Sequence, residues 1–293
     1  MHVMNIIPAQ NLACPIDNIE LLKEQHCYRC ANGHSFDIAK QGYVNLLPVQ
    51  HKKSKKPGDS KAMVQARTRF LNAGFYQPIA DHLSQIIFQK LDNNKDHYIF
   101  DAGCGEGYYL EQVINAAQAV NSKSCLSVIG MDISKPAILA ASKRDKQASW
   151  IVGSNSQPPL LDNSIDLIFC IFGFHSFEGF SHILKPGAKL ILVEPGEKHL
   201  QELREIIYAK PPGEKLDSKS NEVNDYTLID LQTLEFKINL TNNSQILDLL
   251  SMTPHLFRAN SEGKSCIENM NSLELTTDII FKIFEYKQAN NQP

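Results

Sequence analysis

Two cysteines and a histidine near the start of the chain have the residue types and spacing of a small metal site. Cys14 opens a turn that reads CPID, and Cys30-x-x-x-His34 forms a second turn further on. Thiolate sulfur and imidazole nitrogen are common protein ligands of Zn²⁺, which takes four ligands in structural sites. The pattern therefore predicts a zinc ribbon in which each turn supplies part of the coordination sphere.

The fourth ligand is less clear from the sequence. A first turn of this kind usually carries a second cysteine, and here Asp17 stands at that position. Zinc accepts a carboxylate oxygen, so Asp17 is one candidate. Cys27 is the other, because Cys27-x-x-Cys30 also has ligand spacing. If residues 26–30 form a strand, side chains alternate between its faces, Cys27 points away from Cys30, and Asp17 is favoured. Buried cysteines without a metal are the remaining alternative.

A glycine-rich turn marks a second candidate site. Residues 97–114, HYIFDAGCGEGYYLEQVI, have the pattern of an apolar strand, a turn and a helix. The glycines of such a turn adopt positive φ and let the backbone approach a ligand closely. The next strand, SVIGMDI at 127–133, ends in Asp132, whose carboxylate could accept both hydroxyls of a ribose. Together these features predict a nucleoside-containing ligand.

The segments that follow place this turn in an alternating α/β chain. Further strands are expected at 149–154, 165–172 and 188–195, each separated by a turn or helix pattern. Asn155 follows the first of these strands and could meet an adenine. Upstream of the glycine turn, Ser60 is expected to cap a helix that begins near Lys61.

Composition limits the class of protein. The 293 residues are 43% hydrophobic and 21% charged, which suits one large core with a small appendage. No apolar run has the length of a membrane helix, and MHVMNIIPAQNL lacks the basic start of a secretory signal. The seven cysteines are therefore expected in a reducing cytosol without disulfides. A net charge of −3 excludes a uniformly basic nucleic-acid coat, but HKKSKKPGDSK at 51–61 is a local basic patch.

Two motifs resemble those of known enzymes. D-x-G-C-G-E-G at 101–107 resembles the first motif of class I methyltransferases, which bind S-adenosylmethionine, and LKPGAKLILVEP at 184–195 resembles their L-K-P-G-G turn and strand. Over nearly its whole length the chain is similar to the RlmA family of bacterial large-subunit (23S) ribosomal RNA guanine-N(1)-methyltransferases. The segments that carry this likeness are HSFDIAKQGYVNLLPVQHKKSKKPGDS at 34–60, QARTRFLNAGFYQPIADHL at 65–83, DAGCGEGYY at 101–109, HLQELREIIY at 199–208 and LLSMTPHLFRA at 249–259.

The resemblance implies a class I methyltransferase fold, which is α/β and Rossmann-like, with a small zinc-ribbon-like module at its N-terminus. It divides the chain into a zinc-binding module at 1–48, a basic linker at 49–62 and a methyltransferase domain at 63–293. It also implies that Tyr76 and His199 contact the cofactor. The expected cofactor contacts are Tyr76, Asp101, Gly103, Gly105, Glu106, Gly107, Tyr108, Asp132, Asn155 and His199. The expected zinc ligands are Cys14, Asp17, Cys30 and His34.

The implied activity is methylation of a guanine ring nitrogen, N-1, in large-subunit ribosomal RNA. This activity predicts Zn²⁺ and S-adenosylmethionine as cofactors, a cytoplasmic location and no membrane partner, and it leaves a homodimer open. The lysines at 52–56 would contact RNA phosphates or form only a solvated linker. Asp162, Asp166 and Glu178 are carboxylates near expected strand ends, and none is identified as a general base.

Two departures from the family pattern leave other functions open. One is Asp17, and the other is Gly173-Phe174, which stands where the family has an Ala-Pro pair after the fourth strand. The aromatics of this FGFHSF loop, Phe172, Phe174 and Phe177, could stack on a target base or fill the core. The alternatives are a small-molecule methyltransferase and an RNA-binding homologue with impaired catalysis.

Overall fold

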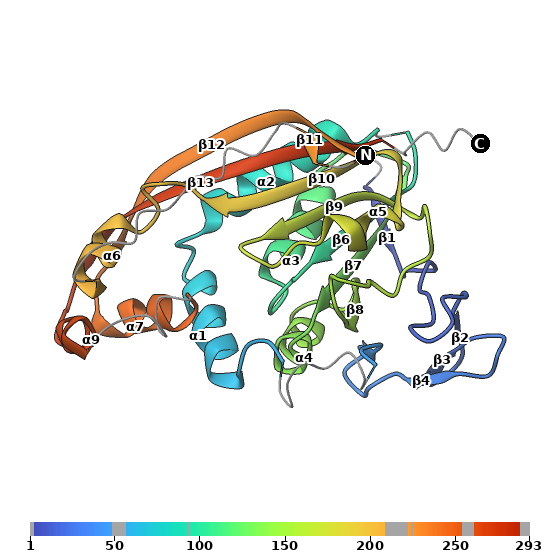
Figure 1. The fold of residues 1–293 in the computed structure, drawn as a ribbon, viewed down its shortest axis with the longest axis horizontal. Coiled ribbons are helices and arrows are strands. Elements are labelled where there is room, and N and C mark those ends of the chain that lie inside the picture. Colours follow the sequence, from blue (N-terminus) through green and yellow to red (C-terminus); the bar gives the residue numbers. More distant parts are fainter. Residues whose placement is uncertain are drawn as a thin grey trace.

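A large mixed β-sheet forms the centre of the protein (Figure 1). The computed structural model describes residues 3–48, 57–92, 94–208, 222–223, 225–253 and 261–287. The lysines at 52–56, most of the predicted linker and residues 254–259 of the family-like segment lie outside the described residues. Within the described part, the strand order is β11-β12-β13-β10-β9-β6-β7-β8-β5, and β1 pairs with β7. The strands of this sheet are β1 (Asn5–Ile7), β5 (Val44–Asn45), β6 (His97–Ala102), β7 (Cys125–Asp132), β8 (Ser149–Val152), β9 (Ile165–Ile171), β10 (Leu184–Pro195), β11 (Glu222–Val223), β12 (Tyr226–Leu240) and β13 (Leu273–Tyr286).

The order of the strands creates a crevice at the carboxyl ends of β6 and β9. These strands are neighbours and run parallel, but the chain proceeds from β6 toward β7 and β8 on one side and from β9 toward β10 on the other. In open α/β sheets, ligands bind where the strand order reverses in this way. β13 runs antiparallel to β10 and to β12, and the described chain between β12 and β13 contains two helices. The predicted class I methyltransferase fold is confirmed by this topology.

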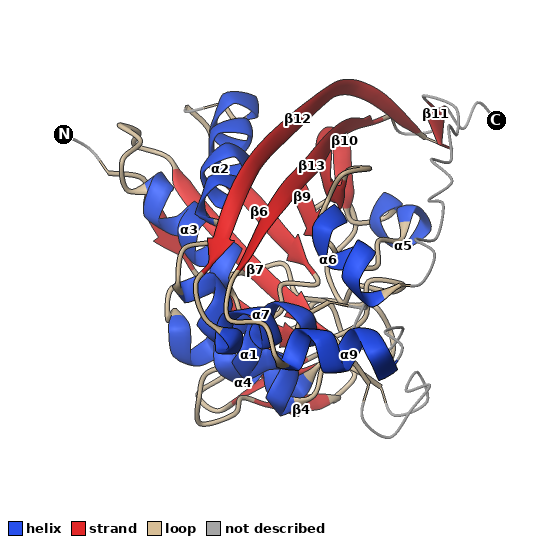
Figure 2. Ribbon diagram, turned by 90° about the vertical axis from the view of Figure 1, so that its left-hand side faces the viewer, coloured by secondary structure: helices blue, strands red, loops and turns tan. Residues whose placement is uncertain are grey.

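Helices cover both faces of the sheet (Figure 2). α2 and α3 pack side by side on one face, and α5 lies on the other. Side chains of successive strand residues alternate between two cores, as Ile99 and Phe100 of β6 do. The helices are α1 (Lys61–Asn72), α2 (Gln77–Lys90), α3 (Tyr108–Ala117), α4 (Lys135–Arg144), α5 (Phe177–Ser181), α6 (Gln201–Ile207), α7 (Asn243–Ser251) and α9 (Ser261–Glu268).

Specific residues fix where α1 and α3 begin. The predicted cap of α1 is confirmed, because the Ser60 hydroxyl accepts a hydrogen bond from the backbone N–H of Met63 at 3.3 Å. α3 begins after Gly107, which has a φ of 86°. A Cβ on Gly107 would stand 2.7 Å from the Trp150 ring, so both the backbone conformation and the space require glycine there.

The N-terminal segment is joined to the large sheet at both ends. A separate three-stranded sheet is formed by β2 (Leu22–Lys23), β3 (Cys27–Arg29) and β4 (Ser35–Asp37). Before it, β1 pairs with β7, and after it, β5 pairs with β8. Cys14, Leu21 and Tyr28 of this segment belong to the same buried core as Phe100 and Met131 of the large sheet. The domain boundary at residue 48 stays a prediction.

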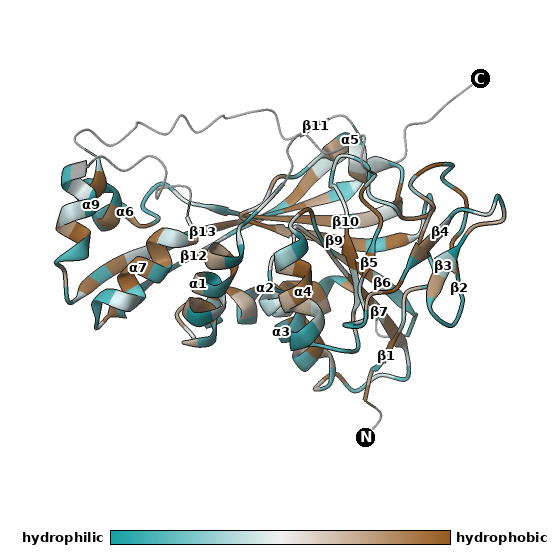
Figure 3. Ribbon diagram, turned by 90° about the horizontal axis from the view of Figure 1, so that it is seen from below, coloured by the Kyte–Doolittle hydropathy of each residue, from teal (hydrophilic) through white to brown (hydrophobic). Residues whose placement is uncertain are grey.

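The outer ends of the molecule differ in character. Figure 1 shows α6, α7 and α9 gathered at the left of the molecule, with β2, β3 and β4 at the lower right. The hydropathy colouring of Figure 3 shows brown, apolar strands at the centre and more teal in the helices and loops around them. No helix of the described chain is long and apolar enough to span a membrane.

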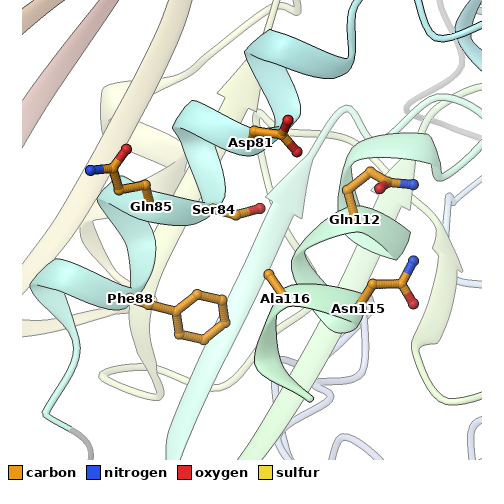
Figure 4. A pocket seen from close by; sticks show the side chains of 7 residues that line it. All are labelled: Asp81, Ser84, Gln85, Phe88, Gln112, Asn115 and Ala116. Carbon is orange, nitrogen blue, oxygen red and sulfur yellow. The ribbon is translucent and has the colours of Figure 1, made fainter. Parts of the chain in front are cut away.

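A shallow groove lies between α2 and α3 (Figure 4). Its volume is about 390 Å³. It is lined by the middle of α2 and the second half of α3, whereas the glycine loop precedes α3, so this groove is separate from the crevice. Its lining residues are Asp81, Ser84, Gln85, Phe88, Gln112, Asn115 and Ala116.

Candidate functional site

The structure brings the four predicted zinc ligands together. One ligand atom from each of Cys14, Asp17, Cys30 and His34 lies within 4.8 Å of the others. His34 Nδ1 is 3.0 Å from Asp17 Oδ2, 3.4 Å from Cys30 Sγ and 3.6 Å from Cys14 Sγ. Two tight turns hold the donors: the N–H of Asn18 donates to the carbonyl of Cys14, and the N–H of Cys30 donates to the carbonyl of His34.

The chemistry of this cluster fits Zn²⁺. Cys14 and Cys30 are buried, and burial, helped by a hydrogen bond with Asp17, raises the pKa of Cys14 to about 11. Such a thiol loses its proton readily only when a cation compensates the thiolate charge. Asp17 Oδ1 is buried and has no hydrogen-bond partner among the described residues, whereas Oδ2 accepts from Asn32 Nδ2 at 2.9 Å. Oδ2 is also the oxygen nearest to His34 and Cys30, so it is the atom that would bind a metal, and Asn32 would hold the carboxylate in place.

Cys27 lies outside the cluster. It begins β3, and its thiol donates to Glu24 Oε2 at 3.2 Å. The neighbouring Tyr28 is buried, while Cys27 faces the opposite side of the strand. The geometry thus agrees with the strand-parity argument for Asp17, and the ligand set itself stays a prediction.

The glycine loop and Asp132 meet in the crevice. Asp132, the last residue of β7, accepts hydrogen bonds from the N–H of Gly105 at 2.9 Å and from the N–H of Ser134 at 2.7 Å, one on each carboxylate oxygen. Burial raises the pKa of Asp132, and these two backbone bonds counter that rise. Each oxygen keeps a second lone pair, so the carboxylate can still accept ribose hydroxyls.

Asp101, next to the end of β6, adds a buried carboxyl group to this site. Its side chain is 2% exposed, and Oδ2 is buried with no partner in the described part of the chain. Burial, followed by the nearby Asp132 and Glu106 carboxylates, raises the pKa of Asp101 well above its usual range. A buried carboxylate of this kind needs a cationic partner. The ammonium of S-adenosylmethionine has the required charge, so the residues fit this cofactor.

Two of the predicted contact residues turn their side chains inward. Glu106 is 1% exposed, accepts from the N–H of Tyr108 at 2.7 Å and lies 3.4 Å from Arg144. The hydroxyl of Tyr108 donates to Gln77 Oε1 at 2.7 Å, and its ring is buried. Cofactor contacts from Glu106 and Tyr108 would therefore come from their backbone.

Tyr76 and His199 form a cluster of three neighbouring rings with a third aromatic, Phe172. The ring centroids of Tyr76 and His199 are 6.3 Å apart, and each ring lies within 6.2 Å of the ring of Phe172. Phe172 stacks on His199 at 5.7 Å with 23° between the planes. Phe172 has a φ of 50°, a left-handed conformation that is rare for a bulky residue and that often occurs at functional sites.

The loop after β9 carries the departure from the family pattern. Phe174 is 71% exposed, and its carbonyl accepts a hydrogen bond from Asn155 Nδ2 at 2.7 Å. The same Nδ2 would stand 3.6 Å from a Cβ on Gly103, so Asn155 bridges this loop to the glycine loop. Phe177 instead packs against Tyr226 at 4.9 Å, as expected for a core residue. Phe172 and Phe174, but not Phe177, are therefore exposed beside the crevice.

The three carboxylates considered as bases lie elsewhere or have other roles. Asp162 and Asp166 are near the amino end of β9, the edge opposite the crevice, and Asp166 binds Lys185 at 2.7 Å. Glu178 belongs to the first turn of α5. The location of Asp162 and Asp166 makes them unsuitable as catalytic bases at the crevice.

Arg67 is a residue at this site that the sequence did not assign to it. Its Nη1 lies 3.4 Å from the position a Cβ on Gly105 would occupy, and it forms an ion pair of 2.5 Å with Asp59. The only signal in the sequence was its place on the helix that Ser60 caps, which does not show what the helix faces.

The protein is a class I S-adenosylmethionine-dependent methyltransferase with an N-terminal ribbon. The order of the strands, the glycine loop and the acidic residue at the end of β7 together define this class. Comparisons with known proteins agree: a zinc-ribbon family model described as "RlmA, N-terminal" matches residues 12–55, and one described as "Methyltransferase domain" matches residues 100–192. YxjB of Bacillus subtilis (strain 168), which has the provisional name of a 23S rRNA (guanine-N(1)-)-methyltransferase, is 30% identical over 84% of this chain and 86% of its own. The chain belongs to the RlmA-like 23S rRNA guanine-N(1)-methyltransferase family, and its cofactors are S-adenosylmethionine and Zn²⁺.

Two further relatives cover about two thirds of the chain. The 23S rRNA (guanine(748)-N(1))-methyltransferase of Streptomyces fradiae is 31% identical over 66% of both chains. A Micromonospora griseorubida protein, provisionally named a 23S rRNA (guanine-N(1)-)-methyltransferase, is 30% identical over 66% of this chain and 68% of its own.

Proposed function

We propose that this protein transfers a methyl group from S-adenosylmethionine to N-1 of a guanine in 23S ribosomal RNA, in the cytoplasm. The observation that carries the proposal is the likeness to relatives named for this reaction, over most of the chain, together with a cofactor crevice flanked by exposed aromatics. In this proposal residues 1–48 present the RNA, 49–62 form a basic linker and 63–293 hold the cofactor.

S-adenosylmethionine, when bound, supplies an electrophilic methyl group on its sulfonium. In the transfer, N-1 of the guanine would take the methyl group as the bond from that carbon to sulfur breaks, and the N-1 proton would pass to a water molecule on the solvent side of the base. The protein's task is to hold both reactants near contact distance with water excluded. Asp101, Asp132 and the glycine loop hold the cofactor. Phe172 and Phe174 offer apolar surface to a base extruded from its stack.

The test is methylation of 23S rRNA taken from a strain that lacks the gene. Purified protein and S-adenosylmethionine are incubated with this deproteinised RNA, and modified guanines are mapped by mass spectrometry after nuclease digestion. One new 1-methylguanosine is expected. Transfer to a metabolite pool and not to RNA would instead identify a small-molecule methyltransferase.

A second candidate function rests on the Gly173-Phe174 departure. A protein that binds S-adenosylmethionine and RNA without transferring the methyl group would be a catalytically impaired homologue. Cofactor binding in calorimetry combined with no new modified guanine in the same RNA would select this candidate.

A further inference from the structure

Arg67 lies against the glycine loop at Gly105. Its Nη1 and Cδ lie 3.4 and 3.8 Å from the position of a Cβ on Gly105, so the end of the side chain rests on that glycine. Nη1 is paired with Asp59 Oδ2 at 2.5 Å, and Nη2 makes a long contact of 3.5 Å with the carbonyl of Met252. A guanidinium has five N–H donors, so these two contacts leave donors available.

The charges around the loop distinguish Arg67 from the other arginine there. Arg144 forms ion pairs with Glu106 and Glu111, so its charge is already paired. Arg67 does not contact these glutamates, and its charge reaches Asp132 as well as Glu106: burial raises the pKa of both carboxyl groups, and the positive charge of Arg67 is among the groups that oppose the rise. Arg67 is thus a cation placed at the cofactor crevice, between acidic residues.

The cofactor has a group that needs such a cation. Its amino-acid end carries an ammonium, which suits Asp101, and a carboxylate, which Asp101 and Asp132 would repel. Arginine binds a carboxylate through two parallel hydrogen bonds. We infer that Arg67 binds the carboxylate of S-adenosylmethionine and that Asp59 positions the Arg67 guanidinium. The inference rests on the proposed function only through this cofactor.

Asp59 is itself held against the cofactor site. Gly58 packs so closely on the turn after β7 that a Cβ there would stand 2.8 Å from Ser134 Cβ, and its φ is 75°. The Ser134 hydroxyl donates to the carbonyl of Asp59 at 2.7 Å, and the Ser134 N–H donates to Asp132 Oδ1. One continuous set of contacts therefore links the predicted ribose ligand Asp132, through Ser134 and Asp59, to Arg67.

Calorimetry with two ligands tests the inference. Decarboxylated S-adenosylmethionine keeps the ammonium, sulfonium and nucleoside and lacks only the carboxylate. The wild-type protein is expected to prefer S-adenosylmethionine. Arg67→Met should weaken S-adenosylmethionine binding by about 10- to 100-fold, the range for a lost charged hydrogen-bond pair, with little effect on the decarboxylated ligand. The preference should then disappear.

Companion variants separate this role from a structural one. Arg69→Met is the matched control, because Arg69 lies on the same helix and is paired with Asp248 at 2.5 Å, away from the loop. It should leave both affinities unchanged. Arg67→Lys keeps the positive charge but cannot form two parallel hydrogen bonds with a carboxylate. It should reduce the preference for S-adenosylmethionine without abolishing it, and Asp59→Asn should do the same. These two variants test the inference if Arg67→Met does not fold.

The outcomes also separate the inference from the proposed function. Equal losses for both ligands in Arg67→Met, or a wild-type protein that binds both ligands equally, would overturn the inference even if ribosomal RNA is methylated. A wild-type preference that Arg67→Met removes would support the inference even if no ribosomal RNA is methylated.

Discussion

Replacement of Asp101 by asparagine should stabilise the protein without cofactor and weaken cofactor binding. Asp101 is buried beside the Asp132 and Glu106 carboxylates, and burial together with these charges raises its pKa well above the usual range. At low pH the carboxyl is protonated in both the folded and the unfolded chain. As the pH rises above about 4, the unfolded chain loses this proton first, and the folded state is penalised by about 1.4 kcal/mol for each pH unit until its own pKa is passed.

The size of the effect follows from the burial of Oδ2 without a described partner. An unsatisfied buried polar group costs about 1–3 kcal/mol, and more when it is charged. Asparagine does not ionise in either state and so escapes this pH-dependent penalty, and Asp101→Asn should raise the free energy of unfolding at pH 7.5 by about 1–3 kcal/mol. In a domain of this size each kcal/mol corresponds to roughly 2–4 °C in melting temperature. The ammonium of the cofactor loses its partner at the same time, so S-adenosylmethionine affinity should fall by about tenfold or more.

Urea unfolding at pH 5.5 and 7.5, with and without S-adenosylmethionine, measures both effects. The free energy of unfolding of Asp101→Asn should exceed that of the wild type by more at pH 7.5 than at pH 5.5. This difference should shrink or reverse when the cofactor is saturating. Asp162→Asn is the control, because Asp162 is exposed near the amino end of β9, and it should leave both curves unchanged. An Asp101→Asn protein less stable than wild type at pH 7.5 without cofactor would show that Asp101 has a stabilising partner in the folded state, and the reasoning would fail.

Three further predictions concern the zinc cluster and the crevice. Asp17→Ala should lower the zinc content measured by elemental analysis while Cys27→Ala retains it, and the reverse pattern would make Cys27 the fourth ligand. Asp132→Ala should weaken S-adenosylmethionine binding by about 1–3 kcal/mol, because a hydrogen-bond pair to ribose is lost; unchanged affinity in calorimetry would remove Asp132 from the site. Phe174→Ala should lower kcat/KM for RNA by the equivalent of about 1–3 kcal/mol of base stacking, with S-adenosylmethionine affinity unchanged. Leu231→Ala, at another exposed apolar residue, should not change kcat/KM, and an equal loss there would argue against stacking on Phe174.

Features that depend on local chain geometry were predictable from the sequence. The apolar strand, glycine turn and helix at 97–114 appear as β6 and α3, and Ser60 caps α1 as expected. Side-chain alternation placed Cys27 on the face opposite the cluster, because that rule depends only on the strand repeat. Each of these features is encoded in a run of adjacent residues.

Features that depend on distant contacts were not predictable in this way. β1 and β5 have three and two residues, too few to show a period, and their pairing with β7 and β8 is visible only in the fold. The same is true of Arg67, whose position over Gly105 depends on how α1 packs.

The attachment of the N-terminal segment at both β1 and β5 changes the thermodynamics of its metal. A free peptide with these ligands must give up the entropy of closing its own loop when zinc binds. Here the pairing of β1 with β7 and of β5 with β8 has already restricted the ends of that loop, so less chain entropy remains to be lost. Zinc should therefore bind the intact protein more tightly than an excised ribbon. Removal of the metal should loosen the chain between the two anchors and leave the anchoring strands paired.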